Sequence, residues 1–137
     1  MRRFLALTCV LANVLLAGCG SDSSTAPTPA SLVGTWNLST VNGRSLPFAI
    51  PSETGSTVEL FGEQLRFDDA TFQRETTLRF TEAPFLRSFS DAGSYTLTAT
   101  GATLTYPYTV GTATFSASTL TIVLEGLQST TLVYHRQ

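Results

Sequence analysis

Apolar side chains recur at every second position from Leu32 onward. In the first run, Leu32, Gly34, Trp36 and Leu38 share one side, and the residues between them are mostly polar. A period of two residues is typical of a β-strand with one buried face, and no part of the domain sustains a helical period instead. The run ends at Asn42-Gly43, a pair that favours a tight hairpin turn. The pattern therefore predicts an all-β domain.

Seven further runs of the same kind follow, so we expect eight strands joined mostly by hairpins. The apolar side chains that we expect to face inward in these runs are Val58, Leu60, Leu65, Phe67, Phe72, Leu78, Phe80, Tyr95, Leu97, Leu104, Tyr106, Tyr108, Ala113, Phe115, Leu120, Ile122, Leu124, Leu132 and Tyr134. The polar residues Arg74 and Thr76 share the inward face of the third run. Most of the inward set is large, which favours a narrow or filled interior.

Two positions interrupt the alternation. The inward parity of the second run changes across Gly62, as it does where a β-bulge inserts one extra residue into a strand. Pro107 lies within the fifth run and has no N–H to donate to a neighbouring strand. We therefore expect a bulge near Gly62 and a strand end or an interrupted pairing at Pro107.

Closure of the sheet is expected because exposed sheet edges promote aggregation. Eight antiparallel strands in sequence favour an up-and-down β-barrel over a sandwich. An eight-stranded barrel is either filled by its side chains or holds one small molecule, and the sequence leaves both open. Strands of a transmembrane barrel run to about 9–11 residues with apolar side chains facing lipid. Several runs here are shorter, which favours a barrel with an apolar interior.

The first residues have the layout of a secretory signal peptide, with Arg2 and Arg3 followed by the apolar stretch Phe4–Ala17. This stretch is too short to cross a bilayer as a helix. Its end, Leu16-Ala17-Gly18-Cys19, resembles a bacterial lipobox, the cleavage site of lipoproteins. The resemblance implies cleavage after Gly18 and a diacylglycerol on the Cys19 thiol. An ordinary signal peptide with a cysteine there by chance is the alternative.

A segment of Ser, Thr, Ala and Pro follows, from Gly20 to Ser31, and is expected to be a flexible tether. We therefore divide the chain into a signal peptide (residues 1–18), a lipidated cysteine with its linker (19–31) and a barrel domain (32–137). The expected location is the cell envelope, with the lipid as the membrane anchor. Gly20, rather than Asp, after the cysteine favours the outer membrane in enteric-type bacteria, facing the periplasm or the cell surface.

Charge and composition exclude several functions. The chain has a net charge of −2 and contains no lysine, so we expect no nucleic-acid partner. Cys9 lies in the signal peptide and Cys19 is expected to carry lipid, which leaves no disulfide. The single histidine, His135, is expected to face outward, and neither a nucleophile arrangement nor a set of metal ligands accompanies it. We expect no catalytic residues, metal or cofactor.

The segment Gly34-Thr35-Trp36 resembles the Gly-x-Trp motif of lipocalins and lipocalin-like lipoproteins. The resemblance extends to Val41-Asn42-Gly43, to Asp91–Thr96 and to Leu120-Thr121-Ile122, and it covers the domain in outline. It implies a lipocalin-like barrel in which Trp36 closes one end and Arg136, after the last strand, packs across its ring. Such a cation–π contact contributes roughly 0.5–2 kcal/mol.

Lipocalin-like barrels often carry a small apolar ligand, so the resemblance also suggests binding. The residues that we expect to line the cavity are Phe72, Tyr95, Tyr106 and Tyr108, with the tyrosine hydroxyls as polar contacts. Two predicted loops, Ser45–Pro51 and Pro84–Phe89, are unusually apolar. They either cap the core or form a contact surface, for which the candidates are Phe48, Phe85, Leu86 and Phe89.

Two functions stay open at this point. The first is non-catalytic binding of a small apolar ligand by a membrane-anchored, exported lipoprotein. The second is an interaction protein or inhibitor-like barrel of the envelope that acts through its apolar loops. A deep cavity would favour the first, and a packed interior with exposed loop phenylalanines would favour the second.

The lipoprotein interpretation predicts that Cys19→Ala releases the protein from the membrane fraction while the domain stays folded. The reason is that two or three acyl chains, at about 0.8 kcal/mol per buried CH₂, are the only anchor expected. Membrane fractionation followed by immunoblotting measures this. A variant that still pellets with membranes after a high-salt wash would show that the interpretation is wrong.

Overall fold

The structure, a computed structural model, describes residues 31–50, 57–80, 83–126 and 129–137. The predicted signal peptide, Cys19 and all of the linker except Ser31 lie outside the described residues, as does Pro51. No helix in the described ranges is long and apolar enough to cross a membrane.

Within these ranges the chain forms antiparallel strands and no helix. The strands are β1 (Gly34–Val41), β2 (Arg44–Ser45), β3 (Phe48–Ile50), β4 (Val58–Phe67), β5 (Thr71–Phe80), β6 (Ala83–Leu97), β7 (Ala102–Thr105), β8 (Val110–Phe115), β9 (Thr119–Leu124) and β10 (Thr130–Arg136). The eight predicted strands correspond to β1 and β4–β10. The β1–β2 connection is the predicted tight turn, with φ of 50° at Asn42 and 74° at Gly43.

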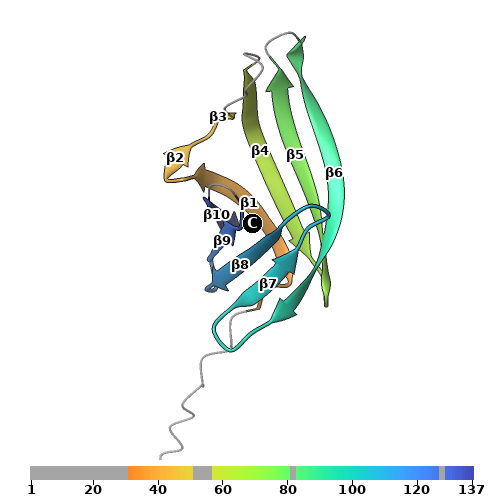
Figure 1. Ribbon diagram of the computed structural model, residues 1–137, viewed down its shortest axis with the longest axis vertical. Coiled ribbons are helices and arrows are strands. Elements are labelled where there is room, and N and C mark those ends of the chain that lie inside the picture. Colours follow the sequence, from red (N-terminus) through yellow and green to blue (C-terminus); the bar gives the residue numbers. More distant parts are fainter. Residues whose placement is uncertain (1–30, 51–56, 81–82, 127–128) are drawn as a thin grey trace, which may run out of the picture.

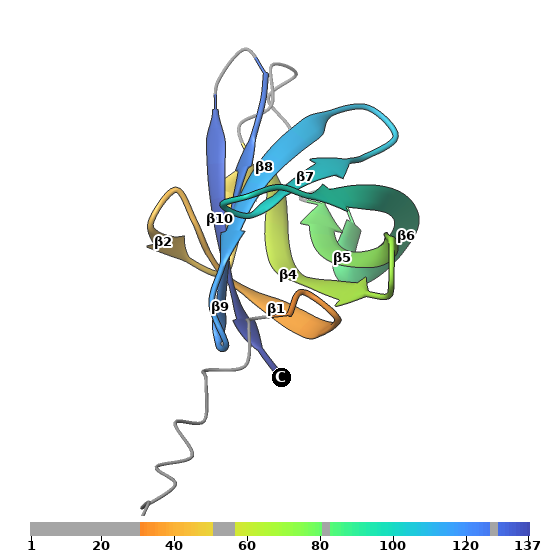
Figure 2. The same cartoon turned by 90° about the horizontal axis from the view of Figure 1, so that it is seen from below.

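The sheet closes on itself (Figures 1 and 2). Neighbours in sequence pair from β4 through to β10, and β1 completes the ring by pairing with both β10 and β4. The short strands β2 and β3 lie outside the ring, where β2 pairs with the end of β1 and β3 pairs with the start of β4. The predicted eight-stranded antiparallel up-and-down β-barrel is therefore confirmed.

A continuous apolar core fills the part of the barrel below the extended ends of β4–β6. Its fully buried large side chains are Trp36, Leu65, Phe72, Leu104, Leu120, Ile122 and Tyr134. These residues come from β1, β4, β5, β7, β9 and β10, so the core joins strands around most of the ring. The prediction of a filled interior is correct for this part of the barrel.

One end of the core is closed by Trp36, whose side chain is fully buried. Its indole Nε1 donates a hydrogen bond to the Leu32 carbonyl oxygen at 2.8 Å. The Arg136 guanidinium carbon lies 4.3 Å from the indole ring centroid, and Nη1 donates to the Val33 carbonyl oxygen at 3.0 Å. Gly34 has a φ of +134°, and a Cβ there would lie 3.0 Å from Arg136 Nη1. The Gly-x-Trp segment therefore provides both the indole and the space for the arginine above it.

Both predicted irregularities are present. The β4–β5 register shifts between Leu60 and Gly62, so one extra residue lies in β4 and the bulge is confirmed. Strand β7 ends at Thr105, and the Tyr106 N–H donates to the Thr109 carbonyl oxygen at 2.9 Å across the turn that contains Pro107. The proline accordingly marks a strand end.

The structure corrects the interpretation of both apolar segments as loops. Residues 83–97 form the single strand β6, which pairs with β5 from Phe80 to Thr71. Pairing with the long strand β5 makes the predicted loop Pro84–Phe89 part of this strand. Ser45–Pro51 contains the end of β2 and all of β3, because β1 and β4 offer free edges to these short segments.

Two residues predicted to face inward are exposed instead. Leu97, the last residue of β6, is 63% exposed, and Tyr108 is 98% exposed. Leu97 adjoins the turn closed by the Thr98 N–H and the Gly101 carbonyl oxygen, and Tyr108 lies within the turn after β7. Alternation predicts the direction of a side chain only inside a strand, so it fails at these reversals.

Trp36→Ala should lower the free energy of unfolding by about 3–5 kcal/mol, because it removes a fully buried aromatic ring from a packed core. Urea unfolding of the domain followed by circular dichroism measures this loss. Tyr108→Ala is the matched control, since that ring is almost fully exposed and its removal should change stability by less than about 0.5 kcal/mol. A loss below about 1 kcal/mol for Trp36→Ala would contradict its role in closing the core.

Candidate functional site

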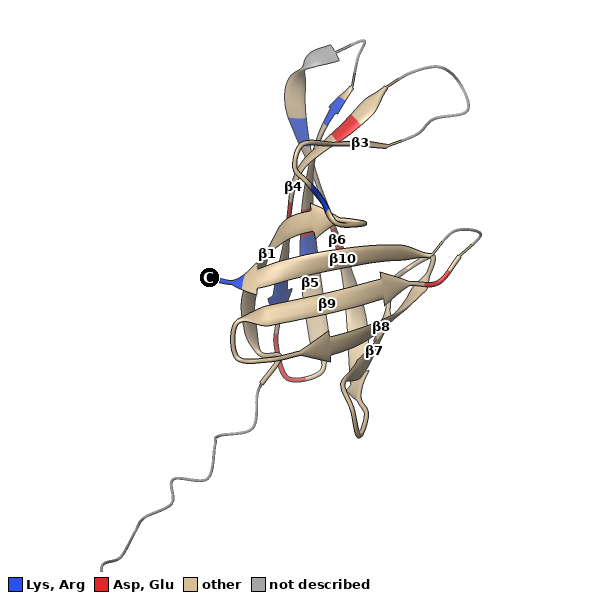
Figure 3. Cartoon of the chain, turned by 90° about the vertical axis from the view of Figure 1, so that its left-hand side faces the viewer, with Lys and Arg blue, Asp and Glu red and all other residues tan. Residues whose placement is uncertain are grey.

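The charged residues of the barrel are concentrated on one side (Figure 3). Strands β4, β5 and β6 have 10, 10 and 15 residues and all carry charges, with β4 and β5 charged on both faces, whereas β7, β8 and β9 carry none. The same three strands extend past the rest of the barrel, as Figure 1 shows. In the part of the chain that the structure describes, no opposite strand covers the inner face of this extension.

Polar side chains face the interior where this extension begins. Glu63 shares the inner face with Leu65 because the two are two residues apart, and the bulge between Leu60 and Gly62 allows Leu60 to face inward as well. Glu63 pairs across the strands with Thr76, and Leu65 pairs with Arg74. Arg74 in turn pairs with Asp91 of β6. Three neighbouring strands thus place Glu63, Arg74, Thr76 and Asp91 side by side on top of the apolar core, and with Tyr106 and Tyr134 they form what we call the polar layer.

The guanidinium of Arg74 is committed to Asp91. Its Nε donates to Asp91 Oδ1 at 2.9 Å and its Nη2 donates to Oδ2, which makes a bidentate ion pair. Burial alone would lower the pKa of Arg74, but the hydrogen bond with Asp91 and the charge of Glu63 raise it overall. Arg74 therefore stays charged, with its guanidinium carbon 5.0 Å from the centroid of the Tyr106 ring.

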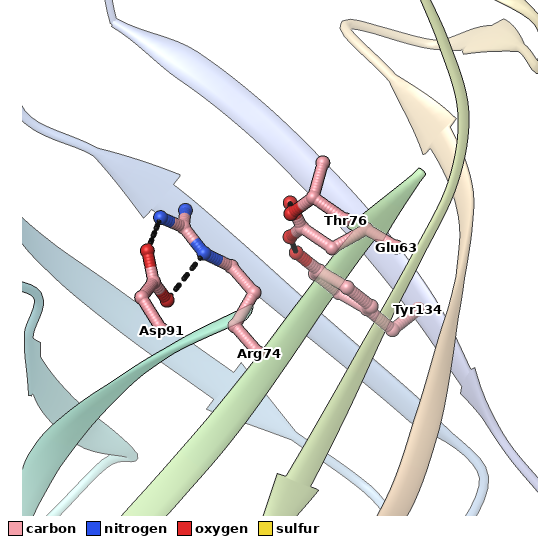
Figure 4. A network of polar contacts seen from close by, with 5 residues as sticks. All are labelled: Glu63, Arg74, Thr76, Asp91 and Tyr134. Carbon is pink, nitrogen blue, oxygen red and sulfur yellow. Dashed lines mark hydrogen bonds and ion pairs between the residues drawn. The ribbon is translucent and has the colours of Figure 1, made fainter. Parts of the chain in front are cut away.

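Glu63 is held by neutral donors (Figure 4). Its Oε1 accepts a hydrogen bond from the Tyr134 hydroxyl at 2.5 Å, and its Oε2 accepts one from the Thr76 hydroxyl at 2.9 Å. Within the described part of the chain, the ion pairs are Arg74–Asp91 and Arg79–Glu59, and neither includes Glu63. The polar layer thus has two carboxylates and one guanidinium, a net charge of −1.

Two buried tyrosines complete the layer. Tyr134 is fully buried, and burial together with the Glu63 carboxylate raises its pKa well above 10.0. Tyr106 is 5% exposed, and burial followed by the charge of Glu63 raises its pKa as well. Its hydroxyl oxygen has no hydrogen-bond partner among the described residues. A buried hydroxyl of this kind is a group that a ligand or a water can satisfy.

Above the polar layer lies an open cleft of about 300 Å³. Its walls are the apolar side chains of Ile50, Leu60, Leu78 and Phe89, and its floor is formed by Glu63, Arg74, Thr76, Ser90 and Asp91. Phe89 is also in edge-to-face contact with Phe80, at 6.2 Å between ring centroids. We call this the cleft. It combines an apolar wall with a charged floor, an arrangement suited to an amphipathic molecule.

Two other hollows are less suited to a small ligand. A larger groove of about 480 Å³ runs over the outer face of β4–β6 and is lined mainly by polar side chains that face solvent, among them Gln64, Arg66, Gln73 and Glu75. A side opening of about 350 Å³ lies where β1 diverges from β4, partly lined by Leu46 and Phe61. Glu63 lines both the side opening and the cleft, so its carboxylate is reached from two directions.

The structure separates the four residues predicted to line a cavity. Phe72 is buried in the packed end, where its ring lies 4.9 Å from that of Tyr106. The Tyr95 hydroxyl donates to the carbonyl oxygens of Asp68 and Asp69, so it is tied to a turn at the closed end. Tyr108 is exposed to solvent, and its assignment as a lining residue is wrong. Of the four, Tyr106 alone belongs to the polar layer.

The predicted loop contacts are also separated. Phe48 is half-buried against the core, with the Arg44 guanidinium carbon 5.6 Å from its ring centroid. Phe89 lines the cleft, whereas Phe85 and Leu86 are more than half exposed along β6. Phe85, Leu86 and Phe89 therefore lie on strand β6 and not on a loop.

The sequence interpretation missed Glu63, Asp91 and Tyr134 as site residues. Tyr134 was assigned to the core, and Asp91 was noted only as the start of the Asp91–Thr96 resemblance. The alternation after Gly62 was a usable signal, because Leu65 and Phe67 were predicted to face inward and Glu63 has the same parity. If the inner face of β4 had been paired with the inner face predicted for β5, Glu63 would have been placed beside Arg74 and Thr76. The place of Asp91 depended on recognising β6.

No group of three or more His, Cys, Asp or Glu side chains that could hold a metal ion occurs in residues 31–50, 57–80, 83–126 and 129–137. The arrangement supports binding through hydrogen bonds and charge. His135 is exposed on β10, where it pairs with Asn37 and Thr119, outside the cleft.

Comparison with known proteins gives distant structural likenesses only. The chain matches no protein-family model and no curated protein. It is similar to a redesigned β-barrel, mFAP1, bound to DFHBI (19% identity, 77% of this chain and 94% of that chain, TM-score 0.38). It is also similar to the Echinococcus granulosus fatty-acid-binding protein 1 (10% identity, 77% of this chain and 96% of that chain, TM-score 0.39). A third similar structure is wild-type fluorescent protein UnaG (12% identity, 77% of this chain and 97% of that chain, TM-score 0.37).

Tyr106→Phe should leave the stability at pH 7 unchanged or slightly higher, because the hydroxyl that it removes is buried without a partner. Above pH 10 the unfolded chain releases the Tyr106 proton while the folded domain keeps it, so the wild type loses stability as the pH rises. The variant should lose less, by up to about 1.4 kcal/mol per pH unit. Urea unfolding at pH 7 and at several values above pH 10 measures both effects. A loss of more than about 1 kcal/mol at pH 7 would show that the hydroxyl is hydrogen-bonded.

Proposed function

We propose that the domain binds a small amphipathic molecule in the cleft, without catalysis. The observation that carries this proposal is the combination of an apolar wall with a charged floor, whose Glu63 carboxylate has no ion-pair partner among the described residues. Binding sites for small molecules combine mostly apolar surface with a few placed polar groups. The apolar part of the ligand lies against Leu60, Leu78 and Phe89, and its polar end meets the polar layer.

The size and position of the cleft limit the ligand. A volume of about 300 Å³ is at the lower end of the range for ligand pockets, so a short chain or a single ring system fits best. The packed core beneath the polar layer leaves no path deeper into the barrel. The ligand therefore lies above the barrel interior, partly exposed between β3 and β6.

We further propose that the protein is an exported lipoprotein of the cell envelope, anchored by lipid on Cys19. The domain begins beside the end of β4, because Gly34 pairs with Phe67, and Arg136 donates a hydrogen bond to the Ser31 carbonyl oxygen. Leu60, at the cleft, lies about 20 Å further along β4. The tether would thus join the closed end and leave the cleft facing away from the membrane.

A second candidate is supported by the edge of β6. This strand pairs with β5 from Ala83 to Ser94, but with β7 only over Ser94–Leu97. The edge between Leu86 and Gly93 is therefore without a strand partner in the described ranges, and Phe85 and Leu86 are exposed beside it. Such an edge can accept a strand from another protein. With this function the protein would bind another protein of the envelope through the edge of β6.

The binding proposal predicts that the lipid-free domain, from Ser31 onward and purified without detergent, binds at least one of octylamine, octanol and octanoate at one site. Phe89→Ala should weaken that binding roughly tenfold, because it removes an apolar wall of the cleft. Titration calorimetry and native mass spectrometry measure affinity and stoichiometry.

Leu86→Ala is the matched control, since this residue is similarly exposed on the same strand but pairs with Arg79 on the outer face. It should leave the affinity unchanged. Absence of binding for all three compounds, or equal losses in the two variants, would contradict the proposed function. Loss of binding to a protein partner by Leu86→Ala alone would favour the second candidate.

A further inference from the structure

The charge of the polar layer indicates what kind of polar end the ligand carries. We propose that the cleft selects an amphipathic molecule with a cationic hydrogen-bond donor, such as a primary ammonium, and disfavours a carboxylate. This inference rests on the binding function proposed above. It names the ligand class for the same cleft.

The first step is the charge balance at the floor. Arg74 and Asp91 neutralise each other in a bidentate ion pair. Glu63 accepts hydrogen bonds from two neutral hydroxyls, those of Thr76 and Tyr134. These bonds stabilise the carboxylate without cancelling its charge. A cation at the floor would supply the missing countercharge, and an anion would add a second uncompensated negative charge in a partly buried place.

The second step is the set of hydrogen bonds that the floor can still make. An ionised carboxylate has about four acceptor sites, of which the contacts above use two on Glu63 and two on Asp91. The Tyr106 hydroxyl oxygen also has no partner in the described ranges, but it is buried and does not line the cleft. A primary ammonium has three donors and no acceptor, so it complements the carboxylate oxygens of Glu63 and Asp91.

The third step is the position of the other arginines, which could in principle attract an anion. Arg79 is on the outer face, in an ion pair with Glu59. Arg87 pairs with Leu78, but it is exposed, and its guanidinium carbon lies 5.0 Å from the ring centroid of Phe85. Neither arginine lines the cleft. Among the described residues that line the cleft, Arg74 is the only cation, and its Nε and Nη2 are already bound to Asp91.

The test compares three octyl compounds that share a chain and differ in charge. Octylammonium should bind the lipid-free domain at pH 7 at least tenfold more tightly than octanol, and octanoate should bind more weakly than octanol. Octanoate binding as tightly as octylammonium would overturn the inference while leaving the proposed binding function in place. Absence of binding for all three would overturn the proposed function itself.

Two variants with the same change in net charge locate the effect. Glu63→Gln should lower the affinity for octylammonium at least tenfold and leave the affinity for octanol within twofold. Glu59→Gln, on the same strand but paired with Arg79 on the outer face, should change neither. Equal losses for octylammonium in both variants would show a general charge effect and overturn the assignment to the polar layer.

Asp91→Asn tests the inference through an expected gain in the affinity for octanoate. The substitution removes the countercharge of Arg74 and makes the floor neutral overall, with a cation free to bind an anion. Octanoate should then bind at least tenfold more tightly than to the wild type, and octylammonium more weakly. An unchanged preference for octylammonium in a folded Asp91→Asn variant would overturn the inference.

Discussion

The extra residue in β4 between Leu60 and Gly62 decides which side chains of that strand face the barrel interior. Because alternate residues point to opposite faces, a shift of one residue exchanges the inner and outer sets. Below the bulge, Leu65 and Phe67 enter the core. Directly at it, Glu63 enters as well, where it meets Thr76 and Tyr134. Without the bulge Leu60 and Glu63 could not both face the interior, so the cleft would lose either its apolar wall or its carboxylate.

The barrel is divided into a packed end and an open end because its strands differ in length. All eight strands of the ring are present at the packed end, where Trp36, capped by Arg136, completes the core. At the other end β4, β5 and β6 continue alone, as Figure 1 shows, and only the short β3 is added at their edge. The polar layer lies at the transition, so water reaches it from above while the apolar core excludes water from below.

Polar groups at such a transition carry a cost that hydrophobic residues would avoid. Replacing a buried ion pair by well-packed apolar side chains is often neutral or stabilising. The bidentate pair of Arg74 and Asp91, the neutral donors on Glu63 and the unpartnered hydroxyl of Tyr106 are therefore poorly explained by stability alone. The place of Glu63, Arg74 and Asp91 at the floor of an apolar-walled cleft agrees with a function in recognising a polar group.

The sequence by itself determined the eight strands, their alternation, the bulge at Gly62, the strand end at Pro107 and the closed barrel, because these depend on local periodicity and turn chemistry. The tertiary structure decided what alternation does not encode. Leu97 and Tyr108 point outward at chain reversals, and Pro84–Phe89 is a strand because β5 pairs with it. Glu63, Arg74 and Asp91 belong to three different strands, so their meeting depends on the registers of two hairpins. The register of a hairpin depends on its turn and on the burial of its apolar face, and alternation along a single strand contains neither, which is the physical reason why the polar layer appeared only in the folded chain.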